Sequence, residues 1–255
     1  MSSPSGLPEL APVVAVVLLA EFAAGTIIVT YLLDALERVG RGFAGTTALI
    51  CAVVMGVDLV VAANLPETGA LLHGPVAVAD VASLIHWSVA LTLMLLGFSL
   101  FCLVGTDPAR HVIGGATVLV AVMVLITSAI AFGPPLGGAL IASAVFLPAA
   151  LLAGSATAGM LLGHWYLISP DLSFRPLRRA VYLIFTALAV QAVCIGSALL
   201  LSRGAGRDEL LGPSFALPFW LLVVGSGVVF TGGVNVLTLY FARLRANQPA
   251  TAMLY

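Results

Sequence analysis

"GMLLGHWYLISPDLSFRPLRR", residues 159–179, shows in one stretch how this chain is built. An apolar segment reaches His164, Trp165 and Tyr166, then a turn at Pro170 and a cluster of arginines. Apolar residues, then aromatic residues, then positive charge is the order expected where a helix leaves a membrane on its cytoplasmic side. The stretch therefore predicts an integral membrane protein made of helices.

The composition extends this prediction to the whole chain. Of 255 residues, 61% are hydrophobic and 8% are charged, whereas about a quarter are charged in a soluble domain. Apolar runs of roughly 20 residues suit helices that cross about 30 Å of hydrocarbon, and they lack the alternation of a membrane barrel. We predict an all-α bundle of seven transmembrane helices, forming a single domain over residues 1–255 with no soluble domain. The runs span approximately residues 10–33, 43–64, 77–105, 112–132, 137–168, 180–202 and 215–242.

Two features inside the runs predict how the helices pack. The fifth run is too long for one upright span and contains Pro148. We therefore expect a strongly tilted or kinked helix, or one that begins outside the bilayer. Gln191 and Asn235 lie within the sixth and seventh runs, where uncharged polar side chains commonly form hydrogen bonds between helices.

The arginines predict the topology. All ten basic residues are arginine, and with seven spans only Arg203 and Arg207 lie on one side of the membrane. The other side receives Arg38, Arg41, Arg110, Arg175, Arg178, Arg179, Arg243 and Arg245. The positive-inside rule then places the N-terminus outside and the C-terminus in the cytoplasm, as in a multi-pass protein of a bacterial cytoplasmic membrane. A net charge of −1 argues against nucleic acid as a partner.

Ionisable side chains at membrane depth are the strongest functional signal in so apolar a chain. Glu21, Asp58, Asp80 and His86 fall in the predicted outer halves of the first three spans. One interpretation is an outward-facing polar pocket or proton-access path, in which Glu21, Asp58 and His86 exchange protons. The alternative is that the aspartates are solvated near the interface, and that Glu21 and His86 are hydrogen-bonded packing residues.

His164 has two interpretations as well. In the first, it belongs to an interfacial aromatic belt with Trp165 and Tyr166, while Pro170 ends the helix and the following arginines face anionic lipid. In the second, His164 is the metal ligand of a haem b iron, or a hydrogen-bond partner of a quinone headgroup. Trp165 and Tyr166 would then wall the pocket, and Arg178 would stabilise a propionate or a semiquinone.

A haem held by two histidines needs both at one depth. His86 is about 9 residues from its outer helix end, and His164 about 25 from the same face, so their heights differ by well over about 10 Å. Only a helix broken at Pro148 would bring this pair together. His111, at the inner start of the fourth run, is closer in level to His164, although it follows "TDPAR" and is equally compatible with a loop.

Three classes of function remain. The absence of lysine excludes a covalently bound retinal, and no HExxH, CxxC, GxSxG or phosphate-binding glycine motif is present. The first class is a membrane subunit of a bacterial electron-transfer or respiratory complex that contacts quinone or haem b, with partner subunits that carry the redox domains. It would be a quinone-binding or non-catalytic subunit of an oxidoreductase. The second is a proton-coupled small-solute transporter or channel. The third is a non-catalytic scaffold or assembly subunit in the lipid bilayer.

Overall fold

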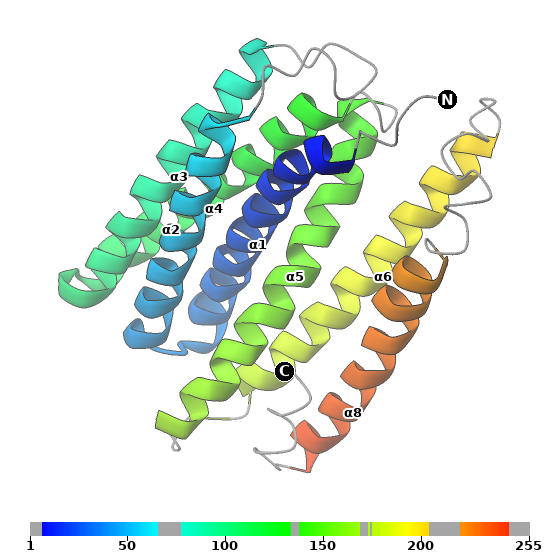
Figure 1. The fold of residues 1–255 in the computed structure, drawn as a ribbon. Helices are drawn as coiled ribbons and strands as arrows, with labels where there is room; N and C mark the ends of the chain where they lie inside the picture. The colour runs from blue at the N-terminus through cyan, green and yellow to red at the C-terminus, as the bar shows by residue number, and fades with distance from the viewer. Residues whose placement is uncertain are drawn as a thin grey trace. The chain divides into compact units, whose positions relative to one another are not determined.

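Every element in the described part of this computed structural model is a helix (Figure 1). The structure describes residues 7–65, 78–133, 138–168, 173, 175–203 and 220–244. The helices are α1 (Leu7–Glu37), α2 (Arg41–Ala63), α3 (Val78–Val104), α4 (Asp107–Phe132), α5 (Ala139–Ile168), α6 (Arg175–Arg203), the π-helical segment η2 (Trp220–Phe230) and α8 (Thr231–Arg243).

These elements confirm the prediction of an all-α, multi-pass membrane protein. Among the described residues, α1 to α6 are long and apolar enough to cross a bilayer, and a shorter apolar helix covers Gly225–Phe241. η2 and α8 follow each other directly and form the seventh helix. α5 continues through Pro148 as one helix of 30 residues. Pro170, Arg207, Arg245 and positions 215–219 of the seventh run lie outside the described residues.

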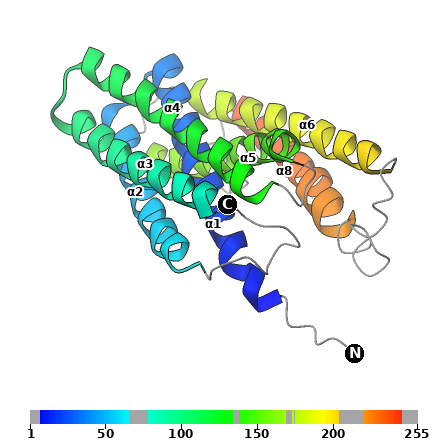
Figure 2. The ribbon, with the colours of Figure 1, turned by 90° about the horizontal axis from the view of Figure 1, so that it is seen from above.

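The chain divides into two compact units, residues 1–154 and 155–255. In the first unit, α1 packs on α2 and α4, and α3 packs on the same two helices. The four therefore form a ring of antiparallel neighbours, as short connections between consecutive helices favour (Figures 1 and 2).

The ring is held by four buried seams with the alternating three- and four-residue spacing of helix bundles. On α1 the seam is Val16, Ala20, Ala23, Ile27, Thr30 and Asp34; on α2 it is Ala44, Ala48, Cys51, Met55, Asp58 and Ala62. On α3 it is Leu84, Ser88, Leu91, Leu95, Phe98 and Cys102; on α4 it is Arg110, Gly114, Thr117, Ala121, Val124, Ser128 and Ala131. Opposite faces expose apolar side chains such as Val53, Val60 and Leu100, which suit contact with lipid tails.

The first part of α5 packs on the back of α1, away from the ring. A Cβ atom on Gly25 would lie 1.7 Å from the Ala150 carbonyl oxygen, and one on Gly154 would lie 2.0 Å from the Gly25 carbonyl carbon. Backbones that approach so closely exclude any side chain at either glycine. Small residues at both positions therefore fix where α5 crosses α1.

In the second unit, α6 packs on α8, and α8 on η2. Asn235 on α8 is 3% exposed, and its side-chain amide donates a hydrogen bond to the Val181 carbonyl on α6 over 3.1 Å. The predicted interhelical role of Asn235 is thus confirmed. Gln191, predicted to act in the same way, has a buried Oε1 with no hydrogen-bond partner among the described residues.

Candidate functional site

Charged side chains gather at one end of the first unit, which we call the polar end: here α1 and α3 finish and α2 and α4 begin. α1 stops because Arg38 has a φ of 51° and Gly40 a φ of 119°, left-handed conformations that end a helix. α4 starts with Thr106 at the N-cap and Pro108 in the first turn, a common helix-start pattern. These local signals place Asp34 and Arg110 inside helices.

A buried ion pair joins α1 to α4 at the polar end. Nη1 of Arg110 lies 2.7 Å from Oδ2 of Asp34, and the two side chains are only 6% and 1% exposed. Nη2 of Arg110 also lies 3.4 Å from Nε2 of His111, and Nε lies 3.8 Å from Oδ1 of Asp107. Burial of either charge alone would be costly, so each residue depends on the other.

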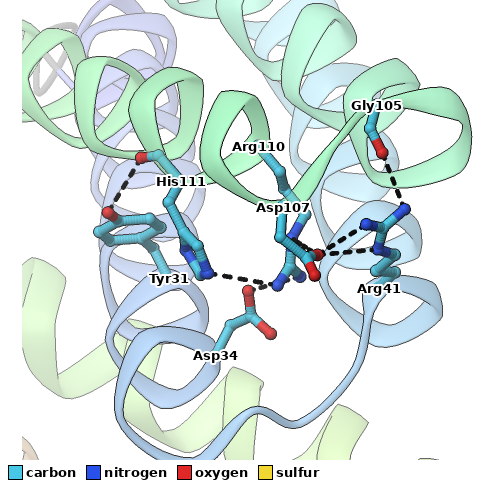
Figure 3. A network of polar contacts seen from close by, with 7 residues as sticks. All are labelled: Tyr31, Asp34, Arg41, Gly105, Asp107, Arg110 and His111. Carbon is cyan, nitrogen blue, oxygen red and sulfur yellow. Dashed lines mark hydrogen bonds and ion pairs between the residues drawn. The ribbon is translucent and has the colours of Figure 1, made fainter.

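Arg41 at the start of α2 extends this cluster (Figure 3). Its Nη2 and Nε donate to Oδ1 of Asp107 over 2.6 and 3.1 Å. Its Nη1 donates to the Gly105 carbonyl over 2.8 Å. The hydrogen bonds therefore tie the beginning of α2 to the link between α3 and α4.

Tyr31 adds a second bond between α1 and α4. Its hydroxyl donates to the His111 carbonyl over 3.0 Å. The ring lies where a side chain on Gly114 would be, since a Cβ atom there would come within 2.6 Å of the Tyr31 ring. The cluster of Tyr31, Asp34, Arg41, Asp107, Arg110 and His111 thus clamps three helices of the ring. Two acids balance two arginines, and the arrangement is that of a structural lock.

Asp58 has very different surroundings. It lies on the α2 seam and is 0% exposed, and the equally buried Ser88 on the α3 seam directs its hydroxyl toward the Asp58 carboxyl. Neither carboxyl oxygen, nor the hydroxyl, completes a hydrogen bond of normal geometry within the described part of the chain. Asp58 is 17 residues from the start of α2 and Ser88 is 16 from the end of α3, about 24–26 Å from the polar end.

The other acids and the histidine of the early helices do not join Asp58. Glu21 is 8% exposed and lies at the same depth, 16 residues before the end of α1. At about 100° per residue it falls on the Gly25 side of α1, which faces α5. His86 is exposed, and its Nδ1 contacts the Ala82 carbonyl over 2.6 Å. Asp80 is half-buried in the first turn of α3. The structure therefore sets Ser88 toward Asp58, whereas Glu21 lies on the α5 side of α1 and His86 is exposed.

The His164 cluster lies at the end of α5 in the second unit, and His111 belongs to the first. His164 and Arg178 are exposed, and Trp165 is half-buried. Tyr166 is 4% exposed, and its hydroxyl donates to the Ser173 carbonyl over 2.6 Å. His111 lies in the second turn of α4 and not in a loop. Within the described residues, no group of three or more His, Cys, Asp or Glu side chains is arranged to hold a metal ion.

Comparison of the chain with protein-family models, curated proteins and solved structures gives no match. The assignment of function therefore rests on the geometry of the polar residues in the two units.

Proposed function

We propose that this protein is a proton-coupled small-solute transporter or channel of a bacterial cytoplasmic membrane, and that Asp58 carries the proton. The supporting observation is a carboxyl group at membrane depth, 0% exposed, that has no ion-pair partner in the described part of the chain and faces only the Ser88 hydroxyl. An ionisable residue inside a membrane is expensive, which makes a functional role its default interpretation. Ser88 supplies a hydroxyl that can donate to or accept from the carboxyl group.

Asp58 is a poor candidate for a purely structural residue. A buried polar group stabilises a fold only when it is hydrogen-bonded, and costs free energy otherwise. The apolar side chains around it on the α2 seam, Cys51, Met55 and Ala62, would pack equally well against an apolar residue. The carboxyl group is explained if it takes up and releases a proton during each transport cycle.

Proton uptake by the purified protein tests this proposal. Liposomes that contain the protein and an internal pH-sensitive dye are given a potassium diffusion potential, negative inside, and acidification is followed. We expect uptake by the wild-type protein, and a loss of about a hundredfold or more in Asp58→Asn, as for removal of a proton-transferring group. Asp107→Asn, which changes an acid 66% exposed at the polar end, is the matched control. Equal uptake by the wild type and Asp58→Asn, or none by the wild type, overturns the proposal.

Glu21 gives the proposal a second residue to test. It is nearly as buried as Asp58 but faces α5, so the two acids would act at different steps or on different sites. In Glu21→Gln, we expect proton uptake driven by voltage alone to persist, and uptake driven by a solute gradient to be lost. A variant that loses both would place Glu21 on the proton route itself.

The second candidate is a respiratory membrane subunit that binds haem b or quinone at His164 with its partner subunits. One observation favours it: the His164 side chain is exposed beside Tyr166, whose hydroxyl bond to Ser173 fixes the end of α5. A b-type signal in a reduced-minus-oxidised spectrum, lost in His164→Ala, would support this candidate. A spectrum without haem, and no quinone-dependent change in fluorescence of Trp165, would contradict it. If Asp58, Glu21 and His164 can all be replaced without loss of proton uptake or of a haem or quinone signal, the scaffold interpretation is correct.

A further inference from the structure

A stripe of polar side chains runs along one face of α1 inside the first unit. Thr26, Thr30 and Asp34 are spaced by four residues, so they lie above one another on the helix. They are 0%, 0% and 1% exposed. The direction of the stripe follows from two contacts. Asp34 pairs with Arg110 on α4, whereas Gly25, on the opposite side of α1 from Asp34, contacts α5. Thr30 and Asp34 therefore lie on the seam that faces the interior of the four-helix ring. Thr26 lies at the edge of this seam, next to the α5 crossing, where a Cβ atom on Gly154 would come within 2.5 Å of its backbone nitrogen.

The oxygen atoms of this stripe share an unusual property. Oγ1 of Thr26, Oγ1 of Thr30 and Oδ1 of Asp34 are buried, and none has a hydrogen-bond partner in the part of the chain that the structure describes. Other buried threonines do not behave in this way: Thr127 donates to the Met123 carbonyl on its own helix over 2.9 Å. Because more than nine tenths of buried polar groups are paired, three consecutive exceptions on one face call for a common explanation.

The stripe also lies at the right depth to continue from Asp58. Asp34, Thr30 and Thr26 are 3, 7 and 11 residues from the end of α1, which is about 5, 10 and 16 Å from the polar end. Asp58 on α2 and Ser88 on α3 follow at about 24–26 Å from the polar end. Measured along the helix axes, unpaired buried oxygens thus recur at steps of about 5–9 Å from the polar end to Asp58. Buried water molecules typically bond to such otherwise unsatisfied polar groups.

We infer that Thr26, Thr30 and Asp34 line a hydrated proton path through the first unit, which connects Asp58 and Ser88 to the polar end. The ligand of the path is water, held by the two threonine hydroxyls and by Oδ1 of Asp34. A proton leaves the Asp58 carboxyl for a neighbouring water molecule, the excess proton passes along the bridged waters, and the carboxylate is reprotonated from the opposite membrane surface. The transport role of this path rests on the proposed function of Asp58, whereas its hydration does not.

Radiolytic footprinting in ¹⁸O-labelled water, read by mass spectrometry, tests hydration in the unmodified protein. Hydroxyl radicals formed from bound water oxidise adjacent side chains. Leu95 on the α3 seam lies at the depth of Thr26 and Thr30, and Leu177 in the second unit is its matched control, since both are 0% exposed. We expect ¹⁸O incorporation at Leu95 and none at Leu177. Equal incorporation at the two leucines overturns the inference.

Proton uptake in variants tests the path separately from Asp58. The double variant Thr26→Val, Thr30→Val removes both hydroxyls at nearly constant volume, and we expect uptake to fall about tenfold or more, as for the loss of one or two hydrogen bonds in a barrier. Thr26→Ser, Thr30→Ser restores the hydroxyls and should restore uptake. Thr127→Val, whose hydroxyl is already bonded, should leave it unchanged.

The outcomes separate the path from the proposed function. If Asp58→Asn abolishes uptake but the double valine variant keeps the wild-type rate, the path is wrong and the function of Asp58 stands. If the wild type takes up no protons while Leu95 is labelled, the hydration is supported and the proposed function fails. An unfolding midpoint for each variant within the wild-type range shows that a loss of uptake is not a loss of fold.

Discussion

Two aspartates of the first unit are equally buried but have opposite surroundings. Asp34 is 1% exposed and pairs with Arg110 over 2.7 Å, within a cluster that also contains Tyr31 and Arg41. Asp58 is 0% exposed, faces the Ser88 hydroxyl and has no ion-pair partner among the described residues. The comparison shows that equal burial can go with different surroundings. Asp34 has a charged partner, and among the described residues Asp58 does not.

Position along the helix explains the difference. Asp34 is three residues from the end of α1, where the first turn of α4 can place an arginine opposite it. Asp58 lies 17 residues into α2, far from the polar end. Its neighbours on the α2 seam are apolar, and the polar group that faces it is Ser88 on the α3 seam. A buried charge with a partner costs little, and its removal leaves the partner unpaired. A buried carboxyl without a charged partner keeps its desolvation cost.

The largest expected effect comes from Arg110, the ion-pair partner of Asp34. Arg110→Met should lower the free energy of unfolding by about 3–5 kcal/mol, because it leaves Asp34 buried and unpaired. Denaturant titration in detergent micelles measures this change. Asp34→Leu combined with Arg110→Met should recover most of the loss, since an apolar pair replaces the ion pair. If Arg110→Met alone were as stable as the wild type, the ion pair would not stabilise the fold, and Asp34 and Asp58 would not differ in this respect.

A change of opposite sign is expected at the unpaired acid. Asp58→Val should raise the free energy of unfolding by about 1–3 kcal/mol, because a buried carboxyl without a charged partner is replaced by an apolar side chain. The same titration measures it, with Thr47→Val on α2 as a control for the change in helix propensity. A destabilisation as large as that of Arg110→Met would mean that Asp58 is a structural residue after all.

A smaller effect is expected from Tyr31, which joins α1 to α4 through one hydrogen bond, from its hydroxyl to the His111 carbonyl. Tyr31→Phe removes the hydroxyl that donates to the His111 carbonyl and keeps the ring beside Gly114. The free energy of unfolding should fall by about 1 kcal/mol. Gly114→Ala, which displaces the ring itself, should cost more; the reverse order would show that the hydrogen bond, and not the packing, holds the two helices.

The smallest effect is expected at the exposed ion pair between Arg41 and Asp107, whose side chains are 41% and 66% exposed. Exposed pairs contribute little because water and salt screen them. Asp107→Asn should leave the unfolding midpoint unchanged within error, at low salt and at high salt alike. A loss comparable to that of Arg110→Met would show that the exposed pair of the structural lock is as important as the buried one.

The seven helices could be predicted from the sequence because each apolar run is about as long as a helix must be to cross the hydrocarbon core of a bilayer. The buried ion pair could not. The predicted first and fourth runs end at 33 and begin at 112, whereas α1 extends to Glu37 and α4 begins at Asp107. Hydropathy places a boundary wherever charge appears, and so it assigns a buried pair such as Asp34 and Arg110 to loops. The Thr106-Asp107-Pro108 sequence was the local signal that could have corrected the start of α4.

The candidate site was predictable in part. Asp58 and Glu21 stand out in the sequence because charge at membrane depth is rare. Which of them meets another polar side chain depends on helix rotation, and the sequence alone does not specify it: Glu21 faces α5, and Ser88 joins Asp58 from α3. The unpaired hydroxyls of Thr26 and Thr30 were equally hidden, since a buried threonine usually bonds a carbonyl of its own helix.

The initial rate of voltage-driven proton uptake by Asp58→Asn, divided by the rate of the wild type, tests the central claim most directly. Both proteins are reconstituted at equal density after their unfolding midpoints in detergent have been matched. The account predicts a folded Asp58→Asn protein whose uptake is about a hundredfold or more below that of the wild type. A ratio close to one would contradict it, because the unpaired carboxyl group would then carry no proton.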